Sequence, residues 1–345
     1  MKPPGNSNNI ELTTYCNAIC PQCPRYKGLD LELQIEQKHM SFENFKKIFE
    51  PSLTDYHFSG TYGDPGMHPE LDKIVEHVLN NSNAFISIST NLSMRDPQFW
   101  WELGIKGSDT KWGRKRLKII AAVDGINQKM HSKYRQQTNL KKILDNLQAL
   151  SETRCKIGIL SIIFKHNEDY IEQIKDMCSV FNPESHEFVE SNRFFRDEPF
   201  LFRNVEGEID SLEPARKYMS AEVNHPGHKI RDIRVNDKID KVDKVTCTFF
   251  RKKTQTTHTD VDGFVAPCCH LLKGEGERYE SKYQASPELE RWWKIRREEE
   301  MNAIDKGFLG VINNEWYTKW LPEALEDAKN MNRICKRFCG NVYDD

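Results

Sequence analysis

The feature that most constrains the fold is a regular alternation of short β-rich segments with amphipathic helical patterns. Helical patterns begin near Ser41, Pro69, Thr138 and Glu168. The β-rich segments recur at about the spacing of βα units, at residues 10–14, 56–60, 84–90, 117–124, 156–164 and 187–190. Because parallel strands need crossover helices, this order predicts an α/β fold with a partial (β/α)6 barrel over residues 9–200. Its functional site should lie at the carboxyl ends of the strands.

The charge balance argues against a polyanionic partner. The 345 residues include 50 basic and 52 acidic side chains, a formal charge of -2, so we expect no nucleic acid partner and no anionic membrane. No apolar run approaches about 20 residues, and the opening MKPPGNSNNIEL lacks the apolar core of a signal peptide. We therefore expect a cytoplasmic protein. The basic run at residues 111–116 is expected to be a solvated turn.

Ten cysteines in a reducing compartment favour metal or cluster ligation over disulfides. Cys16, Cys20 and Cys23 fall within eight residues of one loop after the first predicted strand. Iron-sulfur clusters are held by cysteine thiolates, and a cubane with three of them keeps one iron open to an exogenous ligand. A structural zinc site completed by a distant His or Cys is the alternative.

The segment ELTTYCNAICPQCPR, with its C-x3-C-x2-C spacing, resembles the radical S-adenosylmethionine (SAM) superfamily and its SPASM/twitch branch. The resemblance implies a TIM-like partial barrel in which Cys16, Cys20 and Cys23 hold a 4Fe-4S cluster. The amino and carboxylate groups of SAM would chelate the open iron. One electron would cleave SAM to methionine and a 5'-deoxyadenosyl radical, which abstracts a hydrogen atom from substrate. Gln22 stands where many members have an aromatic residue.

The same resemblance assigns a SAM pocket along the successive strand ends. SGTYGDP after the second strand resembles the GGEP-type motif that meets the SAM ammonium, and LKIIAAVDG followed by Arg135 resembles the run that contacts ribose and carboxylate. Turn, capping and core roles stay open for several of these positions. The residues assigned to SAM are Gly63, Asp64, Pro65, Ser89, Thr90, Asn91, Asp124, Arg135, Ile162 and Asn167.

A second cysteine set lies in the last hundred residues. Asp262-Gly263 predicts a β-hairpin turn ahead of Cys268. The arrangement resembles a twitch or shortened SPASM domain, a small α+β unit over residues 246–345 that follows a bridging segment at 201–245. The resemblance implies an auxiliary 4Fe-4S cluster, and a structural zinc site is the alternative because both share S4 ligation. The implied ligands are Cys247, Cys268, Cys335 and Cys339.

The predicted function is that of a radical SAM enzyme of oxidoreductase or maturase type. Family habit favours a peptide or protein substrate, with flavodoxin or ferredoxin as the electron donor. Radical dehydrogenation or rearrangement of a small molecule, such as an amino sugar or nucleotide, is the second hypothesis. A non-catalytic zinc metalloprotein is the third. The sequence identifies neither the substrate nor the C–H bond attacked.

Overall fold

The computed structural model describes residues 6–108, 115–191, 193–194, 198–216, 244–247, 249, 255–271, 295, 300–326, 335–336 and 339–341. The chain divides into two compact units. The first comprises residues 1–10, 40–56 and 224–345, and the second comprises residues 11–39 and 57–223. None of the described helices is long and apolar enough to cross a bilayer.

The main sheet is open and mostly parallel, with strand order β13-β12-β1-β4-β5-β6-β7-β8. Its central strands follow chain order and pair in parallel. The predicted partial barrel is thus confirmed as an open α/β sheet. The strands with these labels are β1 (Ser7–Ile10), β4 (Asp55–Phe58), β5 (Phe85–Thr90), β6 (Leu117–Ala122), β7 (Lys156–Ile163), β8 (Ser185–Glu190), β12 (Thr256–Thr259) and β13 (Val265–Ala266).

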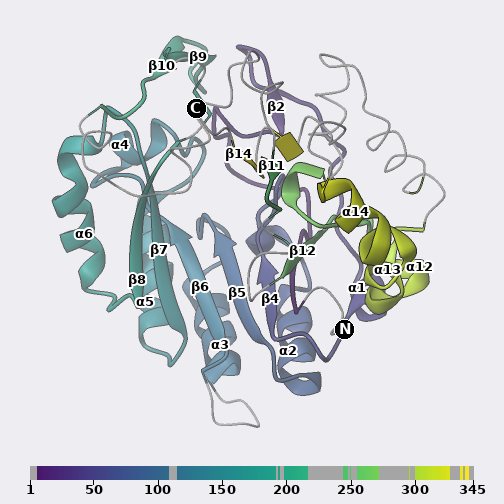
Figure 1. Cartoon of the computed structure of the whole chain (residues 1–345). Coiled ribbons are helices and arrows are strands. Elements are labelled where there is room, and N and C mark those ends of the chain that lie inside the picture. The colour runs from purple at the N-terminus through teal and green to yellow at the C-terminus, as the bar shows by residue number, and fades with distance from the viewer. Residues whose placement is uncertain are drawn as a thin grey trace. The chain divides into compact units, whose positions relative to one another are not determined.

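In the second unit, crossover helices follow β4, β5, β6 and β7 in turn, as parallel pairing requires (Figure 1). Their buried faces repeat every three to four residues, as Ile74, Val75 and Val78 of α2 illustrate. The helices are α2 (Leu71–Asn81), α3 (Pro97–Ser108), α4 (Gln128–Ser132), α5 (Leu140–Ser151) and α6 (Ile171–Ser179), with short η1 (Pro65–Met67) and η2 (Glu168–Tyr170).

Two small hairpins belong to the same unit. They are β2 (Tyr26–Lys27) with β3 (Glu32–Leu33), and β9 (Phe200–Arg203) with β10 (Ile209–Leu212). The second hairpin begins the predicted bridging segment, of which residues 217–243 lie outside the described part of the chain. Leu31, Phe202 and Leu212 pack in one buried cluster with Cys20 of the cysteine loop. The hairpins therefore support the loop through apolar contacts.

The first unit contains the predicted hairpin. β12 and β13 pair antiparallel, and Gly263 adopts φ +87 at the turn, a conformation that favours glycine. β1 pairs in parallel with β12. The remaining elements here are α1 (Phe42–Ile48), β11 (Lys244–Val245), η4 (Cys269–Leu271), α12 (Ala303–Lys306), α13 (Phe308–Ile312), the π-helical turn η5 (Trp316–Trp320), α14 (Leu321–Glu326) and β14 (Gly340–Asn341).

Arg116 departs from its predicted place in a solvated turn, because it is only 4% exposed. Its Nη1 donates to the carbonyls of Ser82 (2.7 Å) and Ala84 (3.1 Å), and its Nη2 donates to the carbonyl of Leu79. The guanidinium thus satisfies carbonyls at the C-terminal end of α2, where a cation also complements the helix dipole. The expectation is wrong for Arg116, and residues 111–114 lie outside the described part.

We predict that Arg116→Gln lowers the free energy of unfolding by about 3 kcal/mol, because buried carbonyls lose a charged donor. Urea unfolding of the metal-free chain measures this. Lys106→Gln is the matched control: its ion pair with Glu76 (2.7 Å) is solvent-exposed and should contribute less than about 1 kcal/mol. Equal losses in the two variants would contradict the buried role.

Candidate active site at the strand ends

The three N-terminal cysteines are gathered in one loop. The backbone N–H of Cys23 donates to the carbonyl of Cys20 at 2.9 Å, which tightens the turn. Burial raises the pKa of the Cys16 thiol to about 12, with Asp64 and Cys20 adding to the shift, and burial raises the pKa of Cys20 to about 11. The thiols therefore keep their protons until a metal displaces them.

The Gly63 segment packs against the chain just before the cysteines. A Cβ on Gly63 would lie 1.8 Å from the carbonyl oxygen of Thr13, so only glycine permits this approach. The buried Glu11 carboxylate accepts hydrogen bonds from the backbone N–H groups of Tyr62 (2.6 Å) and Gly63 (3.2 Å). The motif after β4 is thereby fixed beside the cysteine loop.

Asp64 joins that motif to the end of β5. Its Oδ1 accepts from the Thr90 hydroxyl (2.7 Å) and the Gly66 N–H (2.8 Å), while Oδ2 accepts from the Asn91 N–H (2.7 Å). Burial nevertheless raises the pKa of Asp64 above its usual value. Three donors on one buried carboxylate give Asp64 a positioning role. Pro65 begins η1 directly after it, and Ser89 is half-buried on β5.

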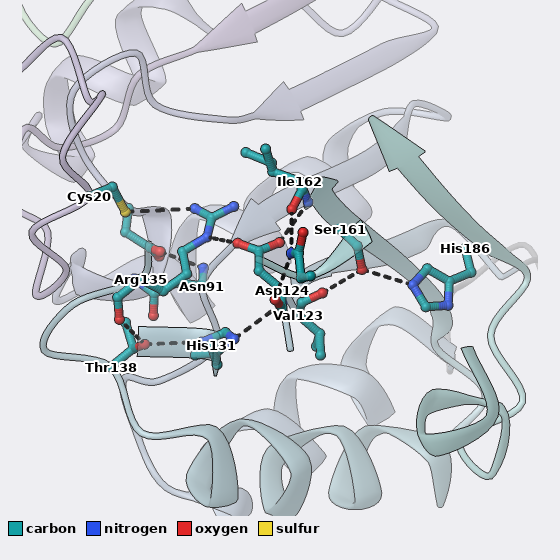
Figure 2. A network of polar contacts seen from close by, with 12 residues as sticks. Cys20, Asn91, Val123, Asp124, His131, Arg135, Thr138, Ser161, Ile162 and His186 are labelled. Carbon is teal, nitrogen blue, oxygen red and sulfur yellow. Dashed lines mark hydrogen bonds and ion pairs between the residues drawn. The ribbon is translucent and has the colours of Figure 1, made fainter. Parts of the chain in front are cut away.

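Two side chains from the loops that follow β5 and α4 reach the cysteine sulfurs. Asn91 Nδ2 lies 3.7 Å from Cys16 Sγ. Arg135 Nη1 lies 3.9 Å from Cys20 Sγ (Figure 2). Both contacts are donor-to-sulfur hydrogen bonds. The structure therefore brings two predicted SAM-pocket residues to the predicted cluster ligands, although the two groups lie far apart in the sequence.

Asp124 is the fully buried centre of a second network (Figure 2). Its Oδ2 accepts from Arg135 Nε at 2.6 Å, and its Oδ1 accepts from the backbone N–H of Ile162 at 2.7 Å. Asn167 Nδ2 donates to the carbonyls of Asp124 and Ile162, both at 2.9 Å. Asn167 is thus occupied in capping the β7 end, and Asp124 aims Arg135.

The His131 side chain holds the backbone of Asp124 in place. The backbone N–H of Asp124 donates to His131 Nδ1 at 3.1 Å, and His131 Nε2 lies 3.1 Å from the Thr138 hydroxyl, which itself donates to the Arg135 carbonyl. Nδ1 is therefore an acceptor and Nε2 a donor, which defines a neutral imidazole. Burial lowers the pKa of His131 to about 4 and keeps it neutral.

Sequence reasoning missed the residues that hold the cysteine loop from its other side. Gln22 Oε1 accepts from the Ser191 hydroxyl at 2.6 Å, and the Gln22 carbonyl accepts from Arg193 Nη1 at 2.6 Å. Arg25 Nη1 donates to the Cys16 carbonyl at 3.1 Å. Arg25 directly follows Cys23-Pro24, so the sequence could have singled it out. No local pattern predicts that Ser191 and Arg193, about 170 residues away, contact Gln22.

In the first unit, the described parts of the C-terminal region gather the second cysteine set. Burial raises the pKa of the Cys268 thiol well above its usual value, and nearby Cys335, Cys269, Cys247 and Cys339 raise it further. All four predicted auxiliary ligands are thus neighbours. β13 ends at Ala266, so Cys268 and Cys269 lie beyond the strand, and strand alternation does not decide which of them faces the others.

Within the described residues, no three His, Cys, Asp or Glu side chains converge to hold one metal ion.

Residues 10–178 match the family model of the radical SAM superfamily, which spans the cysteine loop, Asp64, Asp124 and Arg135. This part of the chain belongs to the radical SAM superfamily. Membership implies an enzyme that uses SAM and a 4Fe-4S cluster for radical chemistry. A search of curated proteins finds no match.

Solved structures show the same fold. SuiB of Streptococcus suis has a TM-score of 0.56 at 12% identity, over 96% of this chain and 72% of SuiB. The anSMEcpe structure with bound AdoMet has a TM-score of 0.51 at 13% identity, over 96% of this chain and 84% of that one. SuiB is also known bound to the precursor peptide SuiA, and anSMEcpe to the Cp18Cys peptide. At these identities, the likeness concerns the fold.

We predict that His131→Gln weakens the pH dependence of stability in the metal-free chain. Folded His131 stays neutral to about pH 4, whereas an unfolded imidazole titrates near 6.5, so stability falls as pH decreases through this window. Between pH 7 and 5, the variant should lose about 1 to 2 kcal/mol less unfolding free energy than wild type. Urea unfolding at both pH values measures this, and an unchanged difference would contradict the neutral assignment.

Proposed function

We propose that this protein is a radical SAM enzyme that abstracts a hydrogen atom from a peptide or protein substrate. The observation that carries the proposal is the convergence of Cys16, Cys20 and Cys23 with Asn91, which follows β5, and Arg135, which follows α4. When bound there, the 4Fe-4S cluster supplies the electron that cleaves SAM to a 5'-deoxyadenosyl radical.

The residues around the loop suit a zwitterionic nucleoside ligand. Arg135, held at its Nε by Asp124, is proposed to pair with the SAM carboxylate through its terminal nitrogens. Asp124 keeps lone pairs for ribose hydroxyls beside its two hydrogen bonds. The Gly63 to Pro65 segment and the strand end from Ser89 to Asn91 are proposed to border the amino group and ribose. Ile162, half-buried on β7, is proposed to pack on adenine.

The peptide substrate rests on the structural neighbours. SuiB and anSMEcpe, which share the fold, were solved with peptides bound. We accordingly propose a peptide or protein substrate and an external flavodoxin or ferredoxin as the electron source. Turnover assays with candidate peptides, alongside amino sugars and nucleotides, test this choice. Hydrogen transfer from a labelled small molecule but from no peptide would overturn it.

The auxiliary site is proposed to hold a second 4Fe-4S cluster on Cys247, Cys268, Cys335 and Cys339. Its support is that these four thiols lie close enough together to influence one another electrostatically. With four thiolates, this cluster would keep no open iron, which suits electron transfer or structure better than SAM cleavage.

Replacing Cys16, Cys20 and Cys23 together with Ala should abolish formation of 5'-deoxyadenosine from SAM under dithionite. The physical reason is loss of every thiolate of the proposed first cluster. Replacing the buried Cys155 and Cys178 with Ala is the control, because it also removes buried thiols but leaves the cysteine loop intact. Chromatography with mass detection measures the product. Cleavage by the triple variant would refute the assignment.

Anaerobically reconstituted protein should hold about eight irons per chain, and Cys268→Ala should lower this to about four. Cys269→Ala, the adjacent control, should keep about eight, because Cys269 opens η4 and is not among the four proposed ligands. Iron and sulfide analysis measures both. If Cys269→Ala loses iron and Cys268→Ala does not, Cys269 is the ligand in place of Cys268. If the wild type binds stoichiometric zinc at this site, the site is a structural zinc site and not an auxiliary cluster.

A further inference from the structure

Arg25 is a buried cation without a matching anion. Its side chain is 1% exposed, and no carboxylate of the described chain lies within ion-pair distance of it. Nη1 donates to the Cys16 carbonyl at 3.1 Å, Nε has no acceptor, and the guanidinium lies 5.3 Å from the Tyr26 ring centre. One carbonyl and one aromatic ring compensate little of a buried positive charge.

The positive charges of other arginines in this unit are compensated by acceptors, by a carboxylate or by solvent. Buried Arg116 has three carbonyl acceptors at the end of α2. Arg135 is paired with Asp124 at 2.6 Å. Arg193, which also lies near Cys23, is exposed to solvent and donates to the Gln22 carbonyl at 2.6 Å. Arg25 has none of these solutions, and burying an unpaired charge is strongly destabilising.

Arg25 lies against the cysteine loop. Its Nη1 donates to the carbonyl of Cys16, and its backbone N–H, two residues after Cys23, hydrogen-bonds the Cys23 sulfur. A cluster held by three thiolates is anionic, and one-electron reduction makes it more negative by one charge. The missing counter-anion of Arg25 is therefore of the kind that the cysteine loop would supply.

We propose that Arg25 is the buried counter-cation of the cluster on Cys16, Cys20 and Cys23 and raises its reduction potential. This inference rests on the proposed function. The electron comes from an external reductant, no bond forms or breaks, and Arg25 keeps its proton throughout. Because the reduced cluster carries the larger negative charge, a fixed cation favours it over the oxidised form. Arg25 is thus a tuning residue and contacts no substrate.

The experiment compares reconstituted wild type with Arg25→Gln, Arg25→Lys and Lys106→Gln. Each is titrated with dithionite at defined potentials, and the reduced first cluster is followed by the paramagnetic resonance signal that SAM perturbs. Arg25→Gln should lower the reduced-to-oxidised ratio at a given potential at least tenfold, equivalent to about 59 mV for one electron. Arg25→Lys, which keeps the charge, should stay near wild type. Lys106→Gln should leave the ratio near wild type, because the Lys106 charge is solvent-exposed and paired with Glu76.

Iron and sulfide content separates the possible failures. A wild-type loop that binds no iron would refute the proposed function itself. Clusters retained in Arg25→Gln with an unchanged potential would overturn only the counter-cation. Arg25→Gln could lose the first cluster altogether. In that case, an Arg25→Lys variant that keeps the cluster at a near wild-type potential supports the need for a positive charge at this position. Loss of iron in both variants would overturn the charge requirement and show that Arg25 acts through its hydrogen bond to the Cys16 carbonyl.

Discussion

Two buried carboxylates, Asp64 and Asp124, hold the strand ends together around the cysteine loop. Asp64 accepts hydrogen bonds from the end of β5, and Asp124 accepts from β7 while it orients Arg135. Buried carboxylates are stable only when donors surround them. The fold itself thus builds the site, and Asn91 and Arg135 reach the sulfurs because Asp64 and Asp124 hold their segments.

Charge at the site follows from the same burial. The thiols are kept protonated by desolvation, and the nearest guanidinium groups act in the opposite direction. A protein that assembled this loop without an anionic ligand would bury Arg25 beside neutral sulfur. Binding a cluster replaces those protons and gives Arg25 its partner, which links the affinity for iron to the stability of the loop.

The sequence was sufficient for the architecture because hydrophobic periodicity is local. The segments before Asp64, Asn91 and Asp124 were recognisable as strands, and the cysteine spacing identified the loop between β1 and the first hairpin. Long-range contacts could not be read in this way. Nothing in its own neighbourhood shows that Arg116 caps α2 or that Ser191 binds Gln22, because each partner is set by tertiary packing.

Roles were harder to predict than positions. Asn167 is predicted either to hydrogen-bond near the nucleoside or to cap the strand end, and its two donor contacts go to backbone carbonyls at the β7 end. Strand alternation could not distinguish Cys268 from Cys269, since the strand stops earlier. The role of each of these side chains depends on the residue at which its strand ends. A sequence pattern locates the ends of an element less accurately than its centre.

The central claim is that three thiolates leave one iron open to SAM, and electron-nuclear double resonance tests it most directly. The reduced, reconstituted chain is measured with SAM that carries nitrogen-15 in its amino group. The account predicts a hyperfine coupling between that nitrogen and the cluster of Cys16, Cys20 and Cys23. An iron-loaded loop that shows no such coupling at saturating SAM would contradict it.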